Sequence, residues 1–96
     1  MLIPTPDPIH VLLVEDNPAD ADLVKDLLAD LDTPAFSVHA VRQLGEARRA
    51  LAEAEYHVVL SDLGLPDSQG LETILGLQTA APQTPLVVFT GAAHDA

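Results

Sequence analysis

The feature that most constrains the fold is an alternation of short apolar runs with segments of helical spacing. The four apolar runs span residues 9–14, 35–41, 57–62 and 85–91, and each has the length of a β-strand. Between them, apolar residues recur at helical spacing within residues 18–31, 44–54 and 71–81. This βαβαβαβ order predicts a parallel sheet covered by helices on both faces, with right-handed crossovers.

The first run and the helix after it carry the clearest local signals. The run "IHVLLV" is continuously apolar, as expected of a strand buried on both faces. Asn17 is a good N-cap, and Pro18 suits the first helical position. An apolar stripe follows at helical spacing: Leu23, Val24, Leu27, Leu28 and Leu31. We therefore expect an amphipathic helix directly after the first strand.

Length and composition indicate one small domain. The chain has 96 residues, of which 48% are hydrophobic, and no cysteine, so disulfides and thiolate metal sites are excluded. Residues 1–8 contain three prolines and are expected to form an irregular arm, and residues 9–96 the domain. No stretch has the length of a membrane span, and the first residues lack the features of a signal peptide, so we expect a cytoplasmic protein.

The charge balance limits the possible partners. Fifteen acidic residues stand against four basic ones, a net charge of −11. Such a surface repels the phosphates of nucleic acids and of anionic lipids, so we expect neither nucleic acid nor membrane as a partner. It favours a cation or a positively charged patch on another protein, although solubility alone explains many of these charges.

Three of the expected strands end in polar side chains. Glu15 and Asp16 follow the first, Asp62 ends the third, and Thr90 and Gly91 end the fourth. Ligands of open α/β sheets bind outside the carboxyl ends of the strands. One acid after a strand is commonly just a solvated turn residue, but three carboxylates at one edge would repel one another unless a hard cation joined them. The sequence thus predicts a Mg²⁺ (or Mn²⁺) site, where an aspartate can accept a phosphoryl group.

At these residues the chain resembles the receiver domain of two-component response regulators. The segment "VLLVEDNPADADLV" is similar to the family's first strand, acidic pair and first helix. The segment "HVVLSDLGLPDSQGLE" is similar to its phosphoacceptor strand and the loop after it, and "TPLVVFTGAA" to its fourth strand. The resemblance covers residues 9–96. It implies a flavodoxin-like, three-layer α/β/α sandwich with strand order 2-1-3-4.

The resemblance also implies a role for each site residue. Asp62 would be the phosphoacceptor, and Glu15 and Asp16 would bind Mg²⁺ together with Asp62 and the backbone carbonyl of Gly64. Thr90, followed by Gly91, would bind the phosphoryl group and act as the switch. The donor would be a phosphohistidine on a sensor histidine kinase or a phosphotransfer protein.

The chain departs from the family pattern at its C-terminal end. Receivers continue into a fifth strand that carries a catalytic lysine, whereas the only lysine here is Lys25, within the first helix. We therefore expect a receiver that is incomplete at the C-terminus, with "LVVF" as an exposed sheet edge that promotes homodimerisation. Loss of one positive contact to the phosphate predicts weak or absent phosphorylation of Asp62. A smaller departure is Gln69, where the family often has an acidic or amide residue.

Two other functions remain open at this stage. One is a phosphorylation-incompetent, receiver-like module for assembly, which the missing lysine strand favours. The other is a haloacid-dehalogenase-like phosphatase, but that family needs a second aspartate where this chain has Gly64. The four histidines are expected to be structural or surface residues, and the three aromatic residues to pack in the core.

Overall fold

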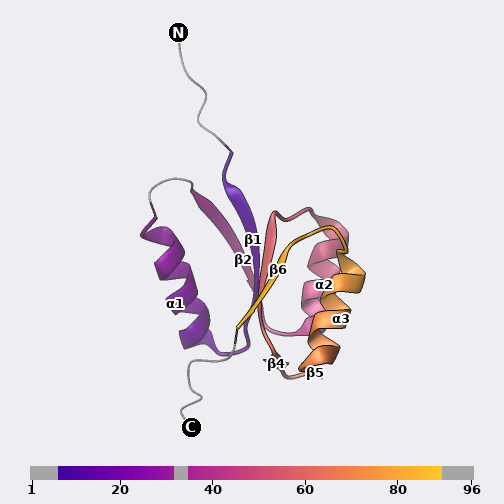
Figure 1. The fold of residues 1–96 in the computed structure, drawn as a ribbon. Helices are drawn as coiled ribbons and strands as arrows, with labels where there is room; N and C mark the ends of the chain where they lie inside the picture. Colours follow the sequence, from indigo (N-terminus) through magenta and orange to yellow (C-terminus); the bar gives the residue numbers. More distant parts are fainter. Residues whose placement is uncertain (1–6, 32–34, 90–96) are drawn as a thin grey trace.

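Four parallel strands form the central sheet of the computed structural model, which describes residues 7–31 and 35–89 (Figure 1). They are β1 (Ile9–Val14), β2 (Phe36–Val41), β3 (Val58–Asp62) and β6 (Leu86–Phe89), in the spatial order β2-β1-β3-β6. This is the 2-1-3-4 order implied by the family resemblance. Nearly all of the expected N-terminal arm lies outside the described residues, as do Thr90 and Gly91.

The helices cover the two faces of the sheet unequally. Helix α1 (Pro18–Ala29) lies on one face, and α2 (Leu44–Glu53) and α3 (Leu71–Ala80) lie on the other (Figure 1). The three-layer α/β/α sandwich predicted from the sequence is therefore confirmed. Among the described residues, no helix combines the length and the apolar character needed to cross a membrane.

Strand β1 is the centre of the molecule. It is bonded to β2 on one side and to β3 on the other, and its residues from Val11 to Val14 are all buried. Leu12 and Val14 face the larger cluster, where they pack with Val59 and with Leu77 of α3. Val11 and Leu13 alternate with them and face the α1 layer, because successive side chains of a strand point to opposite faces. The apolar run "IHVLLV" thus forms a strand buried on both faces, as expected.

Helix α1 begins as the sequence predicts, but its apolar stripe divides into two parts. The Asn17 side chain accepts hydrogen bonds from the N–H groups of Ala19 and Asp20, and Pro18 occupies the first turn. Val24 and Leu28 are half-buried, whereas Leu23 and Leu27 are 51% and 58% exposed. The side of α1 that carries these two leucines is therefore uncovered among the described residues.

A short hairpin that the sequence analysis missed follows the tip of β3. Strands β4 (Gly64–Leu65) and β5 (Ser68–Gln69) pair antiparallel across the two-residue turn Pro66-Asp67. Gly70 ends the hairpin with a φ of 56°, a left-handed conformation that favours glycine, and α3 begins at the next residue. The segment that we expected to be a loop is thus an ordered link between β3 and α3.

The hairpin also supplies the missing N-cap of α2. Gln43, at the N-cap position, makes no side-chain cap bond. Instead, the Asp67 carboxylate accepts hydrogen bonds from the N–H groups of Leu44 (2.7 Å) and Gly45 (2.9 Å). Burial opposes ionisation of Asp67, but these N–H donors outweigh it, so that the pKa of Asp67 lies below its ordinary value. The turn after β3 is thereby attached to the start of α2.

Gly76 marks the closest approach of α2 and α3. A Cβ atom at this position would lie 2.8 Å from a methyl carbon of Leu44. Glycine lowers helix propensity, but here it leaves space for the Leu44 side chain. The packing of the two helices therefore explains a residue that is unfavourable for the helix alone.

Candidate acidic metal and phosphoacceptor site

The candidate site lies at the carboxyl ends of two neighbouring strands. Glu15 and Asp16 directly follow β1, and Asp62 is the last residue of β3. Because Val14 pairs with Ser61 in the parallel register, the residues that follow them emerge side by side. One carboxylate oxygen from each of the three acids lies within 4.8 Å of the other two. The structure thus brings together all three acidic residues expected from the sequence.

Glu15 is the most deeply buried of the three acids, with 2% of its surface exposed. Its Oε2 accepts a hydrogen bond from the N–H of Asn17 at 3.1 Å, whereas its buried Oε1 has no hydrogen-bond partner in the described part of the chain. Burial raises the pKa of Glu15 to about 7, and the nearby charge of Asp62 acts in the same direction. A buried carboxylate oxygen without a donor is costly unless a proton or a cation satisfies it.

Asp62 is buried to a lesser degree, and hydrogen bonds hold it at the strand tip. Its Oδ1 accepts from the N–H of Gly64 at 3.1 Å, so the residue two positions later donates to the carboxylate. The Ser61 hydroxyl, which is fully buried, donates to the Asp62 backbone carbonyl at 2.8 Å. The Asp62 side chain therefore has one oxygen engaged by the backbone and one without a hydrogen bond to any of the described residues.

Two buried hydroxyl groups connect the site to α3. The Oγ1 of Thr73 donates to the carbonyl of Leu63 at 3.0 Å and lies 2.7 Å from the Oγ of Ser68. Leu63 directly follows Asp62, and its carbonyl also accepts from the N–H of Gly70 at 2.9 Å. These bonds hold the chain after Asp62 between the hairpin and the first turn of α3.

The donor set fits a hard divalent cation. Three carboxylates within reach of one another, one of them with an unpaired buried oxygen, repel in isolation and are stabilised by a positive ion. Carboxylate oxygens are the ligands that Mg²⁺ and Mn²⁺ prefer. Glu15, Asp16 and Asp62 are therefore the side chains that would hold such an ion.

The remaining predicted site residues have different outcomes. Gly64 lies beside the cluster through its N–H, but no contact tests the predicted role of its carbonyl. Thr90 and Gly91 lie outside the described residues. Lys25 lies in α1, as expected, and is exposed.

Three residues that support the loop after Asp62 were not predicted from the sequence: Asp67, Ser68 and Thr73. Asp67 in a Pro-Asp turn is the one sequence signal that could have indicated the hairpin. The cap on α2 joins residues 22 and 23 positions apart in the chain, so no local pattern indicates it, and the Ser68–Thr73 hydroxyl pair, although only five residues apart, matches no pattern used above.

The histidines of the described residues do not converge on the acidic cluster. His10 and His57 stack with ring centroids 5.6 Å apart at the starts of β1 and β3, and the His10 N–H donates to Nδ1 of His57 at 2.8 Å. His39 Nδ1 lies 2.8 Å from the Tyr56 hydroxyl oxygen. These contacts agree with the structural and surface roles expected for these histidines.

Known families include one whose pattern matches this fold. The model of the family described as "Response regulator receiver domain" matches residues 11–96. The chain belongs to this family. The match covers every strand and helix described above except the first two residues of β1, and it includes all three acids of the cluster.

Curated relatives of this receiver domain are regulators. It is 32% identical to the swarming motility regulation protein RssB of Serratia marcescens over 82 residues. This alignment covers 85% of this chain and 36% of RssB. It is 35% identical over 79 residues to the response regulator protein PilR of Pseudomonas aeruginosa, covering 82% of this chain and 17% of PilR. The cell cycle transcriptional regulator CtrA of Caulobacter vibrioides is 31% identical over 87 residues, covering 90% of this chain and 36% of CtrA. The chain thus spans about a third or less of the length of these relatives.

Solved structures show the same fold. A receiver domain (CheY-like) from Methylobacillus flagellatus superposes with a TM-score of 0.76 at 29% identity, over 94% of this chain and 75% of that one. The phosphorylated cyanobacterial phytochrome response regulator RcpA superposes with a TM-score of 0.77 at 28% identity, over 92% and 69%. The flavodoxin-like architecture expected from the sequence is therefore confirmed.

Proposed function

We propose that this receiver domain accepts a phosphoryl group on Asp62 from a phosphohistidine of a sensor histidine kinase or phosphotransfer protein, in a reaction that requires Mg²⁺ (or Mn²⁺). The observation that carries the proposal is the acidic cluster itself: three carboxylates within 4.8 Å at the tips of β1 and β3, in a chain of the receiver family. Residues 9–96 would form the receiver unit, with residues 1–8 as an arm before it.

The geometry of Asp62 suits a nucleophile. Its Oδ1 is held by the Gly64 N–H, which leaves Oδ2 to attack phosphorus. A bond forms between this oxygen and phosphorus while the bond from phosphorus to the donor's histidine nitrogen breaks, and that nitrogen keeps the electron pair. The product is an acyl phosphate on Asp62.

Glu15 and Asp16 would hold the metal ion beside Asp62, together with the carbonyl of Gly64. When bound, the ion neutralises the charge that gathers between Asp62 and the phosphoryl oxygens. The Oε1 of Glu15 supports this role because it is a buried acceptor for which residues 7–31 and 35–89 supply no donor. Thr90, with Gly91 after it, would bind the phosphoryl oxygens and act as the switch.

The related structure of RcpA supports the chemistry, because that response regulator was solved in its phosphorylated form. The one lysine of the present sequence lies in α1.

The test is labelling of the 96-residue chain with acetyl phosphate in the presence and absence of Mg²⁺, read by intact-protein mass spectrometry. We expect slow, Mg²⁺-dependent addition of one phosphoryl group, abolished by Asp62→Asn. Asp67→Asn is the matched control, since it changes an aspartate five residues away that caps α2, and it should still be labelled. Labelling that persists in Asp62→Asn would contradict the proposal.

The alternative is a phosphorylation-incompetent module that acts by assembly, which the position of the single lysine favours. Under this alternative, no labelling occurs, and beryllofluoride fails to bind in the presence of Mg²⁺. Beryllofluoride binding that requires Mg²⁺ and Asp62 would exclude it.

We also propose that the partner set includes a second copy of this chain. Strand β6 is an edge of the described sheet, and its Val87 and Val88 are 51% and 38% exposed. An apolar sheet edge promotes pairing with another strand. Nucleic acids and membranes are not proposed as partners, because the net charge of −11 repels both.

A further inference from the structure

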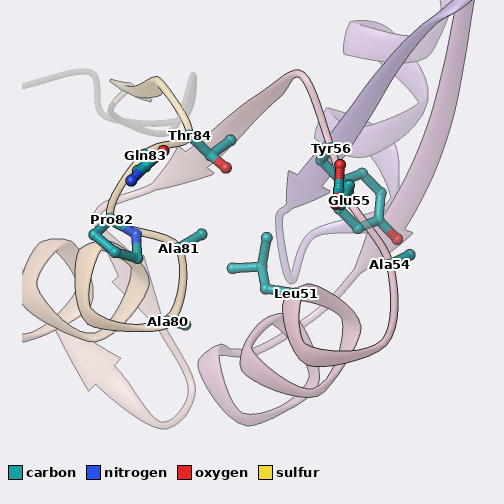
Figure 2. Close-up of a pocket in the computed structure, with 9 residues that line it drawn as sticks. All are labelled: Leu51, Ala54, Glu55, Tyr56, Ala80, Ala81, Pro82, Gln83 and Thr84. Atoms are coloured by element: carbon teal, nitrogen blue, oxygen red, sulfur yellow. The ribbon is translucent and has the colours of Figure 1, made fainter.

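A cavity lies beside the amino ends of β3 and β6, at the opposite end of the strands from the acidic cluster. It has a volume of about 530 Å³, which is within the ~300–1,000 Å³ range of small-ligand sites. Two chain segments line it, the end of α2 with the link to β3, and the end of α3 with the link to β6 (Figure 2): Leu51, Ala54, Glu55, Tyr56, Ala80, Ala81, Pro82, Gln83 and Thr84. In Figure 2 the Leu51 side chain lies between the two segments.

The charges around this cavity are negative. Helices α2 and α3 both end at it, and neither has a basic residue in its last turn. Their last carbonyl groups lack intrahelical donors, and the helix dipoles place negative partial charge at both ends. Glu55 adds a full negative charge, and the nine lining residues include no lysine, arginine or histidine. The cavity therefore attracts a cation.

Besides Glu55, the walls of the cavity contain two neutral polar residues, Gln83 and Thr84, and otherwise aliphatic and aromatic side chains. Leu51, Ala81 and Pro82 offer aliphatic surface, which suits the methylene stem of a long basic side chain. The Tyr56 hydroxyl is bonded to His39, which holds the tyrosine in place, and an aromatic ring is a favourable neighbour for a cation. Negative charge beside aliphatic surface defines the class of ligand as an aliphatic chain that ends in an ammonium or guanidinium group.

We propose that this cavity binds a lysine or arginine side chain of a partner protein. Charge complementarity selects this occupant, because the chain has a net charge of −11 and its cavity combines two helix C-termini with Glu55. The site is distinct from the acidic cluster, since it lies at the amino ends of β3 and β6 rather than at the carboxyl ends of β1 and β3. Its occupation does not depend on phosphorylation of Asp62.

The test uses the ¹⁵N-labelled 96-residue chain, with saturating Mg²⁺ to cover the acidic cluster and with physiological salt to screen nonspecific attraction. The probes are capped lysine (N-acetyl-lysine methylamide) and its neutral analogue, capped norleucine. We expect lysine to shift amide resonances of residues 51–56 and 80–84 in a saturable manner and norleucine to bind at least about fivefold more weakly. Equal binding of both probes, or lysine shifts that appear elsewhere, would overturn the proposal.

Two pairs of variants separate this site from general charge attraction. Glu55→Gln should weaken lysine binding about fivefold, whereas Glu53→Gln removes the same charge two residues away, outside the cavity, and should leave it unchanged. Ala81→Leu should fill the cavity and abolish the shifts, whereas Ala52→Leu adds the same side chain at an exposed position of α2. Equal effects within either pair would contradict a specific site, and thermal melts of all four variants verify folding.

Discussion

At the scale of single residues, Glu15 is suited to the candidate metal site but lowers the stability of the fold when no metal is bound. A glutamate of which only 2% is exposed, and whose one carboxylate oxygen has no partner among the described residues, does not stabilise the folded chain at neutral pH by itself. The proposed cation site would account for its presence at the end of the central strand. The free-energy cost of burying Glu15 therefore depends on whether its carboxylate is protonated and on whether it binds a metal ion.

The raised pKa of Glu15 predicts the pH dependence of stability without metal. The pKa is about 7 in the folded state and 4.5 ordinarily, so the folded chain binds this proton more tightly than the unfolded chain does. The contribution of Glu15 to the free energy of unfolding is therefore greatest below pH 4.5, and it falls as pH rises from about 4.5 to about 7. The loss is up to about 3 kcal/mol.

Urea unfolding in EDTA across this pH range measures the effect, with Glu15→Gln as the variant. Glutamine keeps an oxygen that accepts from the Asn17 N–H and carries no charge, so it should remove most of the decline and raise stability above pH 7. Glu53→Gln, at an exposed position, is the control and should keep the decline. The same slope in Glu15→Gln and in the unmodified chain would disprove the assignment.

At the scale of secondary-structure elements, the β4–β5 hairpin is the part of the site that the sequence did not predict. The apolar runs predicted the four long strands, and apolar residues at helical spacing predicted the three helices, because both patterns are local. The hairpin depends on Asp67 reaching the start of α2, 22 and 23 residues away in the chain, and on a bond between the buried hydroxyls of Ser68 and Thr73. The Asp67 contact arises only once the fold has brought the hairpin to the start of α2, whereas the Ser68–Thr73 bond is local and carries no sequence pattern of its own.

The same limit explains the apolar stripe of α1. Helical spacing predicted Leu23 and Leu27 on one side with Val24 and Leu28, but the contact surface of a helix depends on what the sheet presents to it. The acidic cluster was predictable for the opposite reason. Parallel strands place their carboxyl ends at one edge, so Glu15, Asp16 and Asp62 converge once the strand order is known.

Capping of α2 by Asp67 leads to a prediction at this scale. Asp67→Ala removes both acceptors of the Leu44 and Gly45 N–H groups and should lower the free energy of unfolding by about 1 kcal/mol at pH 7. The matched control is Asp26→Ala, which removes an exposed aspartate from the interior of α1. Since the pKa of Asp67 is lowered by folding, the difference between Asp67→Ala and the unmodified chain should shrink as pH falls below 3.8, where the carboxylate takes up a proton.

Denaturant unfolding of the two variants, at pH 7 and in the acid range, measures these differences. Equal losses for Asp67→Ala and Asp26→Ala at pH 7 would show that the cap contributes nothing beyond the loss of one surface charge.

At the scale of the whole molecule, metal binding should couple the acidic cluster to global stability. A ligand that binds only the folded chain stabilises it by about 2.7 kcal/mol at a hundredfold excess over its Kd. Because Glu15 must lose its proton to bind a cation, Mg²⁺ affinity should rise as pH passes through about 7. Thermal melts with and without Mg²⁺ at pH 6 and pH 8 measure this, and Asp62→Asn should reduce the Mg²⁺ effect at both. A Mg²⁺ effect that is independent of pH and of Asp62 would place the ion elsewhere.

Self-association is the second property of the whole molecule. Strand β6 presents exposed valines along one edge of the described sheet. Helix α1, which alone covers one face of this sheet, carries exposed leucines. Burial of this apolar surface against a second copy is favourable at roughly 25 cal/mol per Å², against a repulsion that the net charge of −11 creates and that salt screens. We therefore expect a dimer at micromolar concentration that strengthens with added salt.

Light scattering after size-exclusion chromatography measures the mass, and two lysine substitutions locate the interface. Val87→Lys places a charge on the exposed edge β6 and should give a monomer, as charged residues do on natural edge strands. Ser37→Lys changes the net charge by the same amount at an exposed position on β2, the other edge of the sheet, and should leave the dimer intact. If both substitutions weaken the dimer equally, charge rather than the β6 edge controls association. If the unmodified chain is itself monomeric at micromolar concentration, the predicted dimer is wrong, because the exposed valines are then stable in water.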